Sequence, residues 1–178
     1  MIQAQRLHTW LAAFAASITV LCSIELALGD GPGRPQYLPI SAKAELGGAT
    51  ILLEVARTPE ERALGLMFRP ALPKDRGMLF PSDPARPARM WMKNVPVPLD
   101  LVFLHEGRVV GLGESIPPCA ETPCPSYGPF GRPVDQVIEL RAGRIGELGL
   151  RLDDPVHVTP LATDERPDLG TEPSSSTR

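Results

Sequence analysis

The strongest hydrophobic pattern in the chain covers residues 99–104, which read LDLVFL. Successive side chains of a β-strand point to opposite faces, and here both faces are apolar beyond Asp100. A strand that is apolar on both faces lies inside a sandwich or barrel rather than at its edge. Burial of each large side chain contributes about 1.5–3 kcal/mol, so this interior strand is expected to be a main stabiliser of the domain.

A stiff connector leads into this strand. The apolar residues 90–92 (MWM) are followed by Lys93 and Asn94, and then by residues 95–98 (VPVP). The two prolines remove two backbone donors, so this last segment is expected to be an extended crossover and not a central strand. Lys93, Asn94 and Asp100 therefore lie at the two ends of one rigid segment beside a tryptophan. The pattern fits a binding site and equally fits an ion pair with a turn cap.

One short helix is expected before the connector. Thr58 is followed by Pro59 and, three positions after Thr58, by Glu61. This is the pattern of a capping box with proline at the first helical position. The helix is expected to end before Pro70.

Further strands are expected on both sides of these elements. A hairpin over residues 44–56 turns at Gly47-Gly48, and a second tight turn at Glu106-Gly107 precedes a return strand over residues 108–115. The remaining expected elements are a buried strand at 77–80, a proline-rich loop at 81–87, a long ordered loop at 116–133, a strand at 137–140, one helical turn at 144–148 and a last strand at 156–158. The predicted fold class is mainly β, a compact β-barrel or β-sandwich with one short α-helix and a disordered C-terminal tail.

The first 29 residues have the pattern of a secretory signal. Arg6 and His8 precede an apolar run, and Ala27 and Gly29 satisfy the small-x-small rule for cleavage after Gly29. The uncharged run is shorter than the roughly 20 residues that a membrane-spanning helix needs. An extracytoplasmic protein, periplasmic or secreted, is therefore expected. The alternative is an uncleaved N-terminal helix that anchors the protein to the membrane.

The rest of the chain divides into three parts by composition. Residues 30–43 contain closely spaced glycine and proline and are expected to be a linker. Residues 44–158 carry the strand patterns and are expected to form one domain. Residues 159–178 are rich in Asp, Glu, Pro, Ser and Thr, so they are expected to be disordered.

Cys119 and Cys124 are the two cysteines that remain if the signal leaves with Cys22. Exported proteins meet oxidising conditions, so a disulfide is expected within the long loop. It would close a ring of six residues, which stabilises by about 2 kcal/mol in the chain-entropy model. The spacing does not match the redox Cys-X-X-Cys pattern. A structural bridge is therefore expected, with a thiol-redox protein as an alternative.

Composition and motifs narrow the function classes. The formal net charge is -3, and basic residues do not cluster densely enough to indicate nucleic-acid binding. The sequence has no nucleophile elbow, phosphate loop or zinc motif. Its methionines (Met67, Met78, Met90 and Met92) are expected to fill the core rather than to bind copper. No cofactor or metal is therefore expected, and a non-enzymatic protein is favoured.

Five ordered motifs resemble one known family. They are Thr58-Pro59-Glu60-Glu61-Arg62-Ala63 with Gly65-Leu66-Met67 and Arg69, Gly77-Met78-Leu79-Phe80, Trp91-Met92-Lys93-Asn94, Pro98-Leu99-Asp100, and Val137 with Glu139-Leu140 and Ala142-Gly143. Residues 44–158 thereby resemble the domain of unknown function 192 family, also called uncharacterised protein family 0127. The resemblance implies an exported or membrane-associated, compact and mostly β domain with one short helix and no established activity. The chain departs from the family at Val95, where threonine is common, and in the cysteine loop, which looks like an elaboration of one branch.

The candidate ligand-binding residues are Arg62, Trp91, Lys93, Asn94 and Asp100. Each also has a structural interpretation. A core position is favoured for Trp91 because large aromatic side chains usually bury. Pairing within the protein is favoured for Lys93 and Asp100, and a turn for Asn94.

The preferred hypothesis is a non-enzymatic, extracytoplasmic binding or accessory module of the cell envelope. Its surface would combine these five residues with the Cys119–Tyr127 loop, and its partner would be an envelope glycan or a membrane protein. Contact with the membrane is expected only through the N-terminal segment. A glycan-acting hydrolase or lyase is an alternative, with Asp100 paired with Glu139 or Glu114. That alternative needs two carboxyl groups within about 5–10 Å in one cleft.

Overall fold

The computed structural model describes residues 33–161. The expected signal at residues 1–29 lies outside the described residues, as do the start of the expected linker and the part of the expected tail beyond Leu161. These expectations therefore remain predictions.

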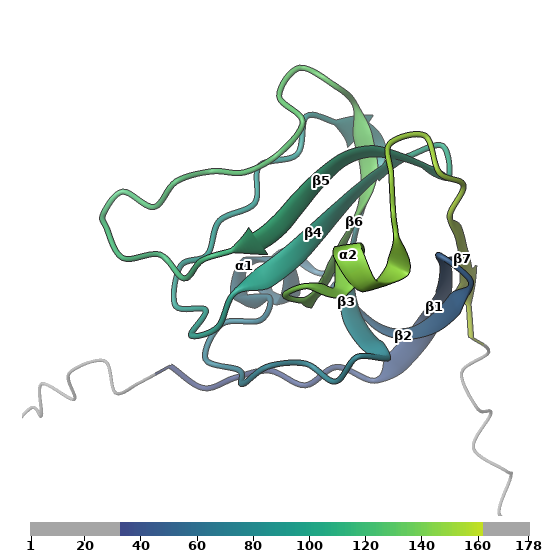
Figure 1. Cartoon of the computed structure of the whole chain (residues 1–178). Helices are drawn as coiled ribbons and strands as arrows, with labels where there is room; N and C mark the ends of the chain where they lie inside the picture. The colour runs from purple at the N-terminus through teal and green to yellow at the C-terminus, as the bar shows by residue number, and fades with distance from the viewer. Residues whose placement is uncertain (1–32, 162–178) are drawn as a thin grey trace, which may run out of the picture. The chain divides into compact units, whose positions relative to one another are not determined.

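The domain is one curled, seven-stranded sheet that forms a half-barrel, with two short helices (Figure 1). The strand order is β5-β4-β6-β3-β2-β1-β7. The elements in chain order are β1 (Ile40–Leu46), β2 (Ala49–Val55), α1 (Pro59–Leu64), β3 (Arg76–Arg86), β4 (Leu99–His105), β5 (Arg108–Ile116), β6 (Val134–Arg141), α2 (Arg144–Leu148) and β7 (His157–Pro160). The mainly β prediction is confirmed. Within residues 33–161 no helix is both long enough and apolar enough to cross a membrane.

The predicted turns and the predicted helix start are confirmed. β1 and β2 form an antiparallel hairpin around Gly47 and Gly48, both of which have positive φ. β2 and β3 pair in parallel, so the chain must cross over between them, and α1 lies in that crossover. Thr58 caps α1 through the expected capping box with Glu61.

Several strands extend beyond their predicted bounds, among them β6, which begins at Val134, and β7, which ends at Pro160. β1 begins at Ile40, ahead of the expected hairpin start at Ala44. β3 does not end at Phe80 but continues to Arg86, so the prediction of a separate loop at 81–87 was wrong. Its pairing with β6 breaks between Pro81 and Arg86. A break of this kind tolerates proline, because the residues in it need not donate to the ladder.

β4 is the interior strand that its sequence predicts. It lies between β5 and β6, and residues 99–104 are all buried. Leu101 is 0% exposed and Phe103 is 2% exposed, while Val102 and Leu104 are buried on the opposite face. Both faces of the sheet are therefore covered at this strand.

The two faces belong to two hydrophobic clusters. The α2 face contains Val102, Ile138 and Ile145 among its buried residues. The opposite face, here called the cleft face, contains Leu101 and Val137, together with residues from the loops that cover it. α1 and α2 lie on opposite sides of the sheet (Figure 1).

A buried ion pair fastens the start of the described chain to the sheet. Arg69 Nη1 lies 2.8 Å from Glu54 Oε2, and both side chains are nearly buried. Glu54 also accepts a hydrogen bond from the backbone N–H of Leu38 at 2.7 Å. The guanidinium of Arg69 stacks over the ring of Tyr37, 4.4 Å from its centroid.

Candidate functional site

A cleft of about 600 Å³ lies between α1, residues 86–95 and β6. Its apolar lining includes Met67, Phe80, Met90, Val95 and Val137. Three of the five predicted ligand-binding residues also line it, namely Arg62, Trp91 and Lys93. A concave, mostly apolar hollow with a few converging polar groups is the usual form of a small-molecule site.

α1 holds one wall of this cleft at both of its ends. Thr58 Oγ1 accepts a hydrogen bond from the N–H of Glu61, and the carboxylate of Glu61 accepts one in return from the N–H of Thr58. At the other end, Gln36 Nε2 donates to the carbonyls of Glu61 and Gly65. The guanidinium of Arg62 donates to the carbonyl of Arg57. These hydrogen bonds therefore hold the helix in place although it is short, and they fix the position of Arg62 on it.

Met90 and Trp91 belong to the opposite wall of the cleft, while Met92 does not line it. Met90 exchanges two backbone hydrogen bonds with Tyr127, and the carbonyl of Met92 accepts from Val95 and Cys119. Met92 is buried, so Trp91 between the two methionines points the other way.

Trp91 is 48% exposed, and its expected place in the core was wrong. In an extended segment, neighbouring side chains cannot all be buried on one face. Lys93 Nζ lies 5.4 Å from the centroid of the Trp91 ring, which is within range of a cation–π contact. The pair contributes a flat apolar surface and a positive charge to one wall of the cleft.

Asn94 lies next to the cleft without lining it. Its backbone has φ of 56°, and its carbonyl accepts a hydrogen bond from the N–H of Phe68 at 2.8 Å. Its side-chain nitrogen lies 3.9 Å from the sulfur of Met67, which does line the cleft. This geometry agrees with the turn that the sequence favours at Asn94.

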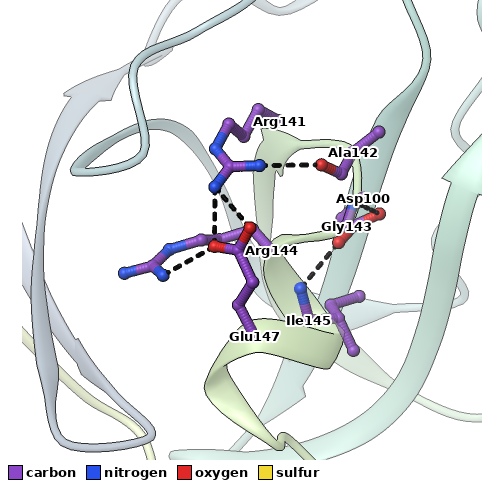
Figure 2. Close-up of polar contacts among 7 residues, drawn as sticks. All are labelled: Asp100, Arg141, Ala142, Gly143, Arg144, Ile145 and Glu147. Atoms are coloured by element: carbon purple, nitrogen blue, oxygen red, sulfur yellow. Dashed lines mark hydrogen bonds and ion pairs between the residues drawn. The ribbon is translucent and has the colours of Figure 1, made fainter.

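Asp100 lies on the α2 face, beside Gly143 and Ile145 (Figure 2), and does not line the cleft. It is 0% exposed. Its carboxylate accepts backbone hydrogen bonds from Ile145 at 2.6 Å, Ser115 at 2.7 Å and Gly143 at 3.1 Å. Asp100 therefore caps α2 from a neighbouring strand, because the orphan N–H groups at a helix start need acceptors.

The outer side of α2 carries an ion-pair group (Figure 2). Glu147 lies 2.6 Å from Arg141 and 3.0 Å from Arg144. Hydrogen bonds from Arg141 and then Arg144 lower the pKa of this exposed carboxyl. The hydrogen bonds of Asp100 and the ion pairs of Glu147 together hold the turn that follows β6.

Glu139 lies on the floor of the cleft and is 4% exposed. Its register partners on the neighbouring strands are Met78 and Leu101, both of them fully buried. Within the described range, its Oε2 atom is buried without a hydrogen-bond partner. Desolvation by burial raises the pKa of Glu139 to about 8.

The sheet register separates Glu139 from Asp100. Glu139 pairs with Leu101, while Asp100 pairs with Leu140. Partners across an antiparallel ladder share a face, so the two carboxyl groups point to opposite faces of the sheet. The geometry therefore gives no support to a shared cleft for these two acids, and Glu114 is exposed on β5.

Four cationic side chains line the cleft around this acid. Arg62 is half-buried, and the other three are exposed. None of the four is in an ion pair among residues 33–161. The set is Arg62, Arg86, Arg89 and Lys93. Sequence analysis identified two of them and missed Arg86, which lies beside Pro87 in the expected loop, and Arg89, which follows that loop.

Cys119 and Cys124 form a disulfide, as the sequence predicts. The bridge holds the loop that packs on the cleft face, where Cys119 and Tyr127 contact the buried cluster. A smaller hollow of about 230 Å³ lies beside this loop, against Met92 and Tyr127. The thiol-redox alternative remains a prediction.

Methionine and histidine side chains are possible metal ligands, and in this structure they make other contacts. The four methionines all pack in or against the cleft-face cluster. His105 Nδ1 lies 3.5 Å from Asp135 Oδ2. In the part of the chain that the structure describes, no three His, Cys, Asp or Glu side chains are grouped as metal ligands.

The comparisons with known proteins identify the family. The model of the domain of unknown function 192 family, described as an uncharacterised ACR, matches residues 42–158. The chain belongs to this family. No curated protein matches the chain.

Two crystal structures resemble this family member. One is a protein of unknown function from Novosphingobium aromaticivorans, with 30% identity and a TM-score of 0.58 over 70% of this chain and 93% of that one. The other, from Sinorhizobium meliloti, is provisionally described as a transcription regulator. It has 30% identity and a TM-score of 0.59 over 71% of this chain and 98% of that one.

Proposed function

We propose that this protein is a non-enzymatic binding module of the cell envelope, and that its ligand occupies the cleft between α1, residues 86–95 and β6. The observation that carries the proposal is the combination of surfaces in one hollow. An apolar lining, four cationic side chains and one buried acid meet there. Such a set suits recognition of a molecule rather than stabilisation of the fold.

The lining favours a ligand with an apolar body and a negative charge. Met67, Met90 and Val137 offer apolar contact, and methionine adapts to ligands of different shape. The cations attract an anion, although the chain as a whole carries a formal charge of -3. A neutral glycan would gain nothing from these charges. A nucleic acid is less suited, because its recognition relies on a basic stripe that follows phosphates.

The sequence supports an extracytoplasmic location for this module. The N-terminal residues have the pattern of a secretory signal, and a disulfide is typical of oxidising compartments. Of the partners suggested by the sequence, an envelope glycan or a membrane protein, a glycan that carries acyl chains and a negative charge suits this cleft best.

Capture from envelope extracts tests the proposal. The full chain is incubated with an extract, and the molecules that it retains are identified by mass spectrometry. Ala63 lines the cleft and is exposed on α1, so Ala63→Trp is expected to block the cleft and to abolish retention of an amphiphilic anion. Ala71→Trp is the matched control, because Ala71 is exposed and does not line the cleft.

The proposal fails if the wild type retains no amphiphilic anion. It also fails if the wild type, Ala63→Trp and Ala71→Trp retain the same molecules in equal amounts. Circular dichroism on each variant confirms that the fold is intact.

A further inference from the structure

The cleft contains a buried acid with one carboxyl oxygen that residues 33–161 do not satisfy. Glu139 is 4% exposed, and its Oε2 has no hydrogen-bond partner within residues 33–161. Nearly all buried polar atoms in folded proteins have a partner, because an unsatisfied one is unfavourable. Since Glu139 lines a cavity, a group from a bound molecule is able to supply the missing hydrogen bond.

At neutral pH this acid is a hydrogen-bond donor. Its surroundings on the sheet are the apolar side chains of Met78 and Leu101. Burial among them raises the pKa of Glu139 to about 8, so the carboxyl is mostly protonated at pH 7. A protonated carboxyl carries one O–H donor, whereas a carboxylate only accepts. The group that best matches it is a carbonyl oxygen.

The charges nearer to solvent require a different group on the same molecule. Arg86, Arg89 and Lys93 are exposed and Arg62 is half-buried, whereas Glu139 lies beneath them on the floor. These four cations repel an ammonium ion and attract an anion. The ligand is thus expected to carry its acceptor deep in the cleft and its negative charge towards the opening.

We propose that the cleft binds acylated anions, whose acyl carbonyl accepts a hydrogen bond from the neutral carboxyl of Glu139 and whose anionic end meets the cations around Arg62 and Lys93. The acyl chain would pack on the apolar lining that includes Met67, Met90 and Val137. This inference rests on the proposed function, because it names the ligand class for the same cleft.

Two probes of equal chain length isolate the carbonyl. N-octanoylglycine has an acyl chain, an internal amide carbonyl and a terminal carboxylate, and undecanoate has the same number of chain atoms without the internal amide. Calorimetric titration of the full chain at pH 6.5 is expected to show N-octanoylglycine binding about tenfold more tightly, the size of one hydrogen bond to a buried group. The methyl ester of N-octanoylglycine, which lacks the charge, is expected to bind more weakly than the acid.

Two variants of Glu139 assign the effect to its O–H group. Glu139→Gln keeps a donor of similar shape, so it is expected to keep the preference for N-octanoylglycine. Glu139→Leu removes the donor and leaves the amide carbonyl without a partner, so the preference for N-octanoylglycine is expected to be lost or reversed. Because Leu suits an apolar floor, loss of the fold does not explain such a result.

The pH dependence adds an independent readout. For the wild type, affinity for N-octanoylglycine is expected to fall about tenfold between pH 7 and pH 9, as the donor loses its proton. Glu139→Gln is expected to show no such fall. Any pH dependence that persists in Glu139→Gln comes from the four cations that line the cleft or from the probe itself.

The outcomes separate this inference from the proposed function. If both probes bind the wild type equally, or if Glu139→Leu keeps the preference, the inference is wrong and the cleft is still a binding site provided Ala63→Trp abolishes binding. If neither probe binds, the inference is wrong, and the capture experiment decides by itself whether the cleft holds another ligand.

Discussion

Asp100 and Glu139 are buried acids on adjacent strands, and they differ in what surrounds them. Asp100, on the α2 face, accepts three backbone hydrogen bonds from β5 and the start of α2. Glu139, on the cleft face, has a buried oxygen without a partner in the described range. The comparison teaches that burial alone does not identify a functional acid. An acid whose partners are all internal stabilises the fold, and one left unsatisfied beside a cavity points to a molecule from outside.

Glu54 is an intermediate case between these two acids. It is buried like them, but its partners are the guanidinium of Arg69 and the N–H of Leu38. Within residues 33–161, the protein thus satisfies one buried acid with backbone groups and another with a charge, and does not satisfy the carboxyl oxygen of the third. The following predictions test whether these differences in hydrogen bonding change the stability of the protein as expected.

The largest expected effect is that of Asp100→Ala. The substitution leaves the N–H groups of Ser115, Gly143 and Ile145 without their acceptor. Because hydrogen bonds to a charged group are worth about 1.5–3 kcal/mol each, the loss of three such bonds should lower the free energy of unfolding by about 4.5 kcal/mol or more in urea titrations. Asp75→Ala is the control at an exposed aspartate and should change it by less than about 0.5 kcal/mol. A loss below about 1 kcal/mol for Asp100→Ala would contradict a structural role.

Arg69→Met should have the next largest effect. It leaves Glu54 buried without its cation, which typically costs about 3–5 kcal/mol. The double variant Glu54→Leu/Arg69→Met should recover most of that loss, because well-packed apolar residues often replace a buried ion pair without penalty. Urea unfolding of both variants measures the difference. If the double variant is less stable than Arg69→Met, the loss does not come from an unpaired Glu54.

Glu139→Leu should stabilise the protein, in contrast to Asp100→Ala. The folded pKa of Glu139 is about 8, above the unfolded value of 4.5. Between these values the unfolded chain has released a proton that the folded state keeps, so the wild type loses stability as pH rises. The advantage of Glu139→Leu should therefore grow by roughly 3 kcal/mol between pH 5 and pH 8. Parallel pH profiles for the two proteins would show that Glu139 is not the buried acid described here.

The smallest expected effect is that of opening the disulfide on the cleft face. The double variant Cys119→Ala/Cys124→Ala should lose about 2 kcal/mol, the entropy of a short ring. Hydrogen exchange should speed up at Met90, Cys119 and Tyr127, whose backbone N–H groups tie the loops together. Strand amides beneath α2 should keep their protection. Reduction of the wild type should reproduce this pattern, and unchanged exchange at those three amides would show that the bridge does not hold the loops.

Local patterns were enough to predict much of the fold. The hairpin turn at Gly47-Gly48 and the capping box at Thr58 depend on residues a few positions apart, and the structure confirms both. The interior position of residues 99–104 also follows from local composition. The sequence also shows methionine at every second position around Trp91, which is the alternation of an extended segment. Met92 is buried and Met90 is partly buried, and apolar residues on either side of Trp91 are compatible with an outward tryptophan, whereas an apolar run taken as a whole predicts a core position.

Prediction of the site needed information about which strands pair and in which register, and local sequence patterns do not contain it. Asp100 and Glu139 fall on opposite faces because of the register between β4 and β6, and a shift of one residue would exchange the faces. No pattern within either strand fixes that register. Arg86 lies at the irregular end of β3, where the pairing with β6 breaks, and Arg89 follows β3; both line the cleft. The sequence did carry a signal for Glu139, a single acid within the buried strand VIEL, although sequence analysis placed it only in the alternative of a glycan-acting enzyme.

The pairing of β1 with β7 places the two ends of the domain side by side. Ala42 lies opposite Pro160 in this ladder, and Leu161 donates to the carbonyl of Ser41. A short peptide could therefore join the two ends, and new termini could be opened at the exposed Gly47-Gly48 turn. The same adjacency makes the domain suited to insertion into a loop of a host protein. Both strands would then connect to the host at neighbouring positions.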